Sequence, residues 1–283
     1  MIDLHTHSTA SDGTRTPAEV VQDSVEAGLS VLALTDHDTS IGWGEAATAA
    51  QHHGIGLLRG MEISCTHNGR SLHLLGYLVD PDHPELVAEL TKARVSRETR
   101  LERMVEKLAA DGIPITMAAV HAQMGAETTP GRPHIADALV ASGYISDRNE
   151  AFTDLLHDNS KYYVAHYAIP AVRGVEVVRA AGGVAVIAHP FASKRGYRHP
   201  VEIIERMAAA GLAGIEVDHS DHDEAARAEL RGVAADLGVF TTGSSDYHGA
   251  GKPNRLGENT TSPEVLEQII DLAHSSVPYL PGR

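Results

Sequence analysis

Residues 1–13, MIDLHTHSTASDG, decide how the rest of the chain is interpreted. An apolar start leads directly into His5 and His7, and Asp12 follows in the next loop. Because side chains alternate along a strand, a strand that ends near Leu4 leaves both rings on one side, where they can reach a single point. This arrangement is typical of a metal site, although a lone His-x-His at a frayed terminus is an equally common explanation.

Other predicted strands end in the same kinds of residue. Active sites of open α/β sheets and barrels form where parallel strands end, so side chains at these positions are expected to converge. His73 lies near the start of the strand 72–79, and it reaches the same edge only if that strand runs against its neighbour. The strands and the residues after them are VLALT (31–35) with Asp36, His37 and Asp38, LLRGM (57–61) with Glu62, VAVIA (184–188) with His189, and VFTTGSS (239–245) with Asp246 and His248.

Together these positions supply more ligands than one tetrahedral ion needs, and they suit two or three divalent metal ions that share carboxylates. A mixture of imidazoles and carboxylates favours manganese, iron or zinc over calcium, which prefers oxygen ligands alone. The single cysteine, Cys65, excludes a thiolate cluster. The predicted metal ligands are His5, His7, Asp12, His37, Glu62, His73, His189, Asp246 and His248.

The chain alternates strands and helices in two stretches that are separated by helices alone. In residues 1–83 and 169–283, short apolar strands alternate with helices such as 17–27 and 42–53, which is the α/β pattern of a parallel sheet or barrel. Residues 84–168 begin with a long amphipathic helix and continue with further helical segments. We therefore expect a discontinuous α/β domain, 1–83 and 169–283, with an inserted helical subdomain, 84–168, that caps the site.

The composition favours a small phosphorylated substrate over long duplex nucleic acid. The formal net charge is −15, whereas a nucleic-acid face needs a basic stripe. No apolar run approaches the roughly 20 residues of a membrane span, and the first residues lack a signal-peptide pattern, so we expect a cytoplasmic protein without membrane contact. The 18 histidines, against 4% aromatic residues, point to metal or phosphate chemistry.

The order of the motifs resembles that of the polymerase and histidinol phosphatase (PHP) family. DLHTHSTASDG, LTDHD, GMEIS, LHLLGY, AHP and SSDYH follow one another between residues 3 and 257. The resemblance implies a distorted seven-stranded β/α barrel, similar to a TIM barrel, with a metal cluster that hydrolyses phosphoesters. It also implies three metal positions, held by His5, His7, Glu62 and Asp246, by Glu62, His73 and His189, and by Asp12, His37 and His248.

The inserted segment is similar to one branch of this family, the nucleoside 3′,5′-bisphosphate phosphatases, through TPGRPHIADALV and SKYYVAHYAIP. This similarity implies that Arg132, His134 and Lys161 contact the phosphates of the substrate, Arg132 as a fork of donors and Lys161 as a point charge. Both cations also lie beside predicted helix starts, where solvated charges are common. His222, at a strand end, is a further candidate phosphate ligand. Asp246 is a candidate general base.

The remaining acidic and histidine residues are expected to play supporting roles. Asp36 and Asp38 flank His37 and are expected to orient its ring, because a ligating imidazole commonly donates its other N–H to a carboxylate. Asp38 could instead cap a helix. His219 is expected to be an exposed loop residue. Surface or hydrogen-bonded core positions are expected for His52, His53, His67, His83, His121, His157, His166, His199 and His274.

The activity that the resemblance implies is hydrolysis of the 3′-phosphate of a nucleoside 3′,5′-bisphosphate, which yields a nucleoside 5′-monophosphate and phosphate. Cleavage of short 5′-phosphorylated RNA from its 5′ end is closely related, because one phosphate grip could position either substrate. Hydrolysis of histidinol phosphate or another phosphomonoester is an alternative. A non-catalytic metal-binding module is an alternative of another class, against which the full set of ligand residues argues.

Overall fold

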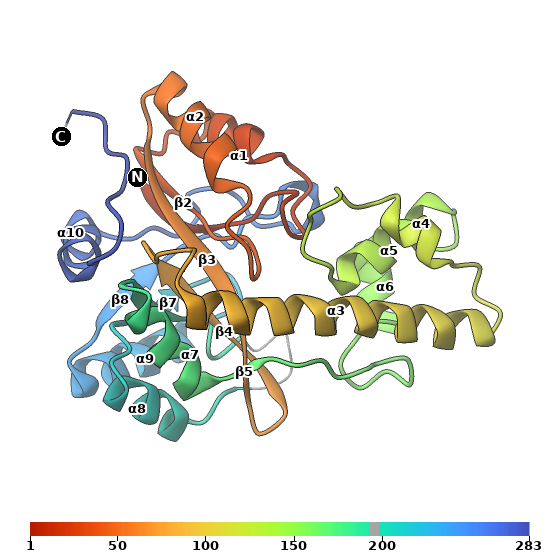
Figure 1. Ribbon diagram of the computed structural model, residues 1–283. Coiled ribbons are helices and arrows are strands. Elements are labelled where there is room, and N and C mark those ends of the chain that lie inside the picture. Colours follow the sequence, from red (N-terminus) through yellow and green to blue (C-terminus); the bar gives the residue numbers. More distant parts are fainter. Residues whose placement is uncertain (193–197, 283) are drawn as a thin grey trace.

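The computed structural model describes residues 1–192 and 198–282. Its centre is a nearly closed, barrel-like sheet of seven strands in the order β1-β2-β3-β4-β6-β7-β8 (Figure 1). The short strand β5 (Ile169–Pro170) pairs with β3 beside this path. The expected distorted α/β barrel is therefore confirmed. The seven strands are β1 (Ile2–Thr6), β2 (Val31–Leu34), β3 (Gly56–His67), β4 (Arg70–Tyr77), β6 (Val184–Ala188), β7 (Gly214–Asp218) and β8 (Phe240–Gly243).

One strand, β4, runs against both of its neighbours, whereas the pairs β1–β2, β2–β3, β6–β7 and β7–β8 are parallel. The β3–β4 turn contains Asn68 and Gly69, both with positive φ, as a tight hairpin requires. His73 of β4 pairs with Ala188, the last residue of β6. The reversed strand therefore brings His73 to the edge where the parallel strands end.

The barrel interior is divided into an apolar end and a polar end. An apolar cluster joins the first residues of strands, including Ile2, Val31 and Val184, to Leu266 and Ile269 of α10. The opposite end holds the buried polar side chains that follow the strands. The helices of the α/β part are α1 (Pro17–Glu26), α2 (Trp43–His53), α7 (Ala171–Ala180), α8 (Val201–Ala209), α9 (Glu224–Leu237) and α10 (Pro263–Leu272), with a short 3₁₀ turn, η2 (Gly249–Gly251).

The helical part has an apolar core of its own. Leu86 and Leu90, in the first turns of α3 (Pro84–Ala110), pack into the barrel core, whereas Leu101, Met104 and later residues of the same helix pack into a second cluster. Figure 1 shows α3 running from the barrel to the group formed by α4 (Met117–His121), α5 (Arg132–Ala141) and α6 (Arg148–Asp154). One long helix thus links both cores. Within the described residues, no helix has the length and apolarity that crossing a membrane requires.

Candidate metal centre

Four side chains converge at the carboxyl end of β1. The Nε2 atoms of His5 and His7 lie 3.1 Å apart, and they lie 3.2 and 3.0 Å from Oε2 of Glu62. Oδ1 of Asp246 lies 3.5 Å from each of the two nitrogens. Ligand atoms about 2.0–2.1 Å from a tetrahedral ion are themselves about 3.3–3.4 Å apart. These four atoms therefore have the spacing of one metal coordination shell.

The other carboxylate oxygen of Glu62 faces a second pair of imidazoles. Its Oε1 lies 2.5 Å from Nδ1 of His73 and 3.2 Å from Nε2 of His189. Burial alone would raise the pKa of Glu62, but the facing histidines, His73 foremost, lower it well below its usual range. Glu62 is therefore ionised, and its two oxygens are placed to bridge two metal positions.

A third group forms around Asp12. Its Oδ1 lies 3.2 Å from Nε2 of His248 and 3.7 Å from Nδ1 of His7, and its Oδ2 lies 3.8 Å from Nε2 of His37. Burial, followed by the charge of Lys252, lowers the pKa of His248 to about 4, and burial also lowers the pKa of His37. Both rings are therefore neutral at pH 7, as metal ligation requires.

The donor atoms of these groups fit bound metal ions. Four buried side-chain atoms at the cluster lack a hydrogen bond within the described residues: Nδ1 of His37, Nε2 of His219, Oδ1 of Asp246 and Nε2 of His248. Each of these atoms lies within 3.5 Å of a carboxylate or imidazole atom of the cluster. Buried polar atoms are normally satisfied, so atoms without a hydrogen bond in such a place call for a missing partner. All nine predicted ligands belong to groups close enough to share ions: seven occur in the clusters around His5, His7 and Asp12, and His73 and His189 join through Glu62.

Glu216 is a central residue of the site that the sequence analysis did not identify. Its Oε1 accepts a hydrogen bond of 2.9 Å from Nδ1 of His5 and another from the Ser244 hydroxyl, and its Oε2 accepts one of 2.8 Å from the backbone N–H of His189. A carboxylate on the outer nitrogen of a metal-binding histidine fixes its tautomer and ring orientation. The sequence does contain one indication of this role, because Glu216 is a charged residue between Ile215 and Val217 of a buried strand.

His219 is buried, which corrects the expectation of an exposed loop residue. Its Nε2 lies 3.4 Å from Oδ2 of Asp246, and Nζ of Lys252 lies 2.7 Å from the same oxygen. Burial alone would raise the pKa of Asp246, but Lys252 and the facing histidines lower it well below its usual range. Such a carboxylate is a strong ligand and a weak proton acceptor.

The two aspartates beside His37 do not orient its ring, so that interpretation was wrong. Asp36 accepts hydrogen bonds from the backbone N–H and hydroxyl of Ser8 and from the hydroxyl of Ser11. Asp38 has a φ of 52° and turns toward Ser64 and Arg97. Consecutive side chains after a strand point in different directions. Asp36 therefore fixes the loop after β1, and Asp38 fixes β3, and both segments carry candidate metal ligands.

The helical part holds the loop that carries Asp12. Four successive carbonyl oxygens of this loop, those of residues 9–12, accept hydrogen bonds from the Thr128 hydroxyl, the Thr129 N–H, Nε2 of His134 and Nη1 of Arg148. The loop also folds tightly on itself, since a Cβ at Gly13 would lie 2.5 Å from the His7 carbonyl oxygen. Movement of the helical part would therefore move Asp12.

The four candidate phosphate ligands have different surroundings. Nη1 of Arg132 donates to the Leu156 carbonyl at 2.6 Å and to Asp158 at 2.6 Å, and its guanidinium stacks on aromatic rings. His134 accepts from Gly131 N–H and donates to Ser11, so both of its nitrogens are used. Lys161 is exposed and pairs with Asp111. His222 is held between Val217 and Phe191 backbone groups. Arg132 keeps two donors, Nε and Nη2, with no hydrogen bond among the described residues, and it is less exposed than Lys161.

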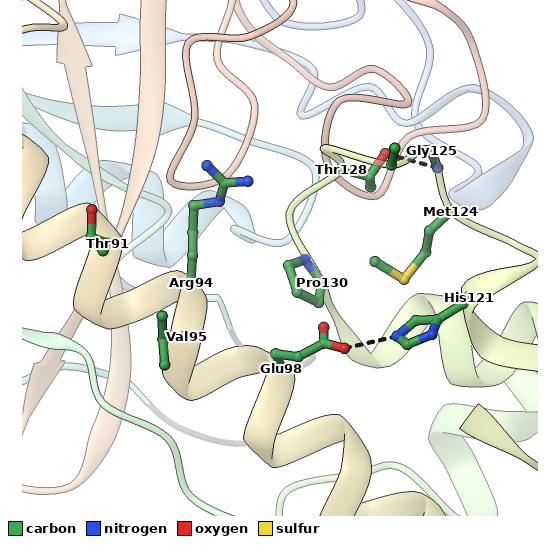
Figure 2. Close-up of a pocket in the computed structure, with 10 residues that line it drawn as sticks. Thr91, Arg94, Val95, Glu98, His121, Met124, Gly125, Thr128 and Pro130 are labelled. Carbon is green, nitrogen blue, oxygen red and sulfur yellow. Dashed lines mark hydrogen bonds and ion pairs between the residues drawn. The ribbon is translucent and has the colours of Figure 1, made fainter. Parts of the chain in front are cut away.

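A cavity of about 520 Å³ lies between α3, the end of α4 and the loop that follows α4 (Figure 2). Glu98 and His121 form an ion pair of 2.7 Å in it, and the Thr128 hydroxyl accepts from Gly125 N–H. The lining contains none of the predicted metal ligands, so the cavity is separate from the metal centre. It is lined by Thr91, Arg94, Val95, Glu98, His121, Met124, Gly125, Ala126, Thr128 and Pro130.

Comparisons with known proteins agree with this geometry. A 5′-3′ exoribonuclease of Haemophilus influenzae is 34% identical over 95% of this chain and 96% of its own. A 3′,5′-nucleoside bisphosphate phosphatase of Chromobacterium violaceum is 34% identical over 95% of this chain and 94% of its own. A solved structure from Bifidobacterium adolescentis, assigned as a metal-dependent phosphoesterase, superposes with a TM-score of 0.94 at 39% identity, covering 100% of this chain and 98% of that one.

The family model of the PHP domain matches residues 3–230, most of the chain. The match includes β1, with the His-x-His pair, and extends through β7, with Glu216. The chain is therefore a member of the PHP family.

Proposed function

We propose that this protein is a metal-dependent phosphoesterase that removes the 3′-phosphate of nucleoside 3′,5′-bisphosphates. The observation that carries the proposal is the convergence of nine candidate ligand residues on one edge of the barrel, with buried side-chain atoms that lack hydrogen bonds. Arg148 of the helical part contacts the Asp12 carbonyl, and Arg97 contacts Ser64 of β3. The Chromobacterium relative supports the substrate, and the Haemophilus relative supports short 5′-phosphorylated RNA as a second substrate.

Two or three divalent ions, manganese, iron or zinc, would occupy the three groups. Bound divalent ions make water more acidic and neutralise charge on a phosphoryl group. The protein's part is to hold the ligands: Glu62 spans two groups, Asp12 anchors the third, and Glu216 keeps the His5 ring in one tautomer. In the reaction the bond between phosphorus and the 3′-oxygen breaks, a water oxygen joins phosphorus, and its proton passes to the leaving oxygen or to solvent.

We propose separate roles for the sequence-predicted substrate residues. Arg132 binds a phosphate through the donors that Asp158 leaves unused. His134 acts indirectly, through its hydrogen bond to the loop of Asp12. Asp246 serves as a metal ligand, since its low pKa makes it a poor general base. Lys161 and His222 receive no role, because their partners lie elsewhere.

A substrate panel tests the proposal. Phosphate release is measured with manganese-loaded protein on adenosine 3′,5′-bisphosphate, AMP, histidinol phosphate and a short 5′-phosphorylated RNA. Release from the bisphosphate that far exceeds release from the monoesters is the expected result. Preference for histidinol phosphate would refute the substrate, and no release from any compound would favour the non-catalytic metal-binding module.

A further inference from the structure

The third group of candidate metal ligands lies in loops rather than in strands. Asp12 and His248, whose side chains are 3.2 Å apart, both follow the end of a strand, whereas His5 and Glu62 lie within β1 and β3. The two loops contact each other, because the Thr14 N–H donates to the His248 carbonyl at 3.1 Å. Strand pairing does not fix these two ligands, so other contacts must hold them in place.

Arg148, the first residue of α6, contacts both loops. Its Nη1 donates to the Asp12 carbonyl at 2.9 Å. The same nitrogen lies against Gly251, where an added Cβ would collide with it. The Gly251 N–H in turn donates to the His248 carbonyl at 3.2 Å. One guanidinium nitrogen of the helical part is therefore packed between the two loops that carry Asp12 and His248.

Asp137 of α5 fixes the direction of this guanidinium. Its two carboxylate oxygens accept hydrogen bonds of 2.6 Å from Nε and Nη2 of Arg148. This pairing occupies one edge of the guanidinium and leaves Nη1 for the Asp12 carbonyl. The Arg148 side chain is only 13% exposed. Because Asp137 neutralises Arg148, and because Arg148 donates to the carbonyl of Asp12, the Asp12 carboxylate stays available to a cation.

The other two groups are held by contacts within the barrel. Nδ1 of His5 donates to Glu216 of β7, and His73 of β4 faces Glu62 of β3. These contacts join one strand to another and do not include the helical part. Loss of the Arg148 contact would therefore disturb the third group and leave these contacts in place.

We propose that Arg148 is a positioning residue for the third metal position, and that an ion binds there tightly only when the helical part is docked on the barrel. The assignment rests on the proposed function, which includes three metal positions. Coupling between two events is reciprocal, so an ion bound by Asp12 and His248 also stabilises the docking of the helical part. The third position thereby links metal binding to the closure of the site by its cap.

The test is a manganese titration of chelator-treated protein by calorimetry, with the bound metal counted by elemental analysis. Arg148→Met is expected to weaken the affinity for one equivalent by about 10–100-fold, the effect of one charge-assisted hydrogen bond, and to change the others less than about twofold. Arg173→Met, which breaks an exposed ion pair with Glu85, is the matched control and should change none. Equal weakening of all equivalents, or of none, would overturn the proposal.

Gly251→Ala is a second variant that keeps the arginine. Its Cβ displaces Nη1 of Arg148 from the Asp12 carbonyl, so it should weaken the same equivalent. The double variant should bind this equivalent no more weakly than Arg148→Met does, because both substitutions remove one contact. Losses that add in the double variant would overturn the proposal.

Amide exchange of the metal-free protein separates this proposal from the proposed function. Asp36 still holds Ser8 and Ser11 in Arg148→Met, so the expected change is faster exchange at Gly13 and Thr14, the next amides along the loop. Exchange at the wild-type rate would overturn the anchoring role. If Arg148→Met loses one equivalent but the wild type hydrolyses no bisphosphate, only the proposed reaction fails.

Discussion

Replacing Glu216 with glutamine should weaken metal binding without changing the shape of the site. All three partners of the carboxylate are donors: Nδ1 of His5, the Ser244 hydroxyl and the N–H of His189. In Glu216→Gln the side-chain N–H₂ group replaces one carboxylate oxygen. Because both oxygens accept hydrogen bonds in the wild type, at least one of the three partner donors then faces an N–H₂ donor and loses its hydrogen bond. The loss of one charge-assisted hydrogen bond costs about 1.5–3 kcal/mol. At about 1.4 kcal/mol per tenfold change, metal affinity should fall roughly 10–100-fold.

The assay is titration of chelator-treated protein with manganese, followed by calorimetry or by a competing metal indicator. Glu205→Gln, an exposed position on α8, is the matched control and should bind metal as the wild type does. Circular dichroism checks that Glu216→Gln remains folded. If Glu216→Gln binds manganese within twofold of the wild type, Glu216 does not orient His5, and the argument from its hydrogen bonds fails.

Three further outcomes are expected. Arg97→Met should destabilise the protein by about 3–5 kcal/mol, because it leaves Asp38 buried without a counter-ion; a melting temperature equal to the wild-type value would contradict this. Arg100→Met should instead raise the melting temperature, because Arg100 of α3 is buried and its Nε has no hydrogen bond, so the substitution removes an unpaired buried charge; a lower value would mean that Arg100 supports the fold. The metal-free protein should lose stability as the pH falls from about 6.5 toward 4, because in this range the histidines of the unfolded chain bind protons that the buried histidines of the native state do not bind. The free energy of unfolding should fall by about 1.4 kcal/mol per pH unit for each such proton, and a denaturation midpoint that does not change with pH would refute this. The pKa is lowered for His37, His134, His166, His222 and His248 and raised only for His5 among the shifted histidines described.

The convergence of the candidate metal ligands was predictable because a strand end combines a fixed periodicity with a fixed place in the fold. His5 and His7 share a side by the alternation of β1, and parallel strands bring Glu62 and His189 to the same edge. His73 required one extra condition, an antiparallel strand, which the register of β4 meets.

Contacts between distant elements were not predictable in this way. Glu216 lies inside a strand rather than at its end, and its partners are 211 and 27 residues away. Arg97 and Arg100 share a helix face, yet only the packing of β3 and the loop before α5 decides that one is paired and the other is not. Sequence pattern locates residues on an element, whereas tertiary contacts assign their partners.

The most direct test of the account is phosphate release from adenosine 3′,5′-bisphosphate by chelator-treated protein before and after manganese is added back. The account predicts negligible release without metal, full recovery with manganese, and no recovery in His7→Ala, because His7 contributes to two of the ligand groups. Equal release with and without metal, or no release after reloading, would contradict the claim that this edge of the barrel is a metal-dependent phosphoesterase site.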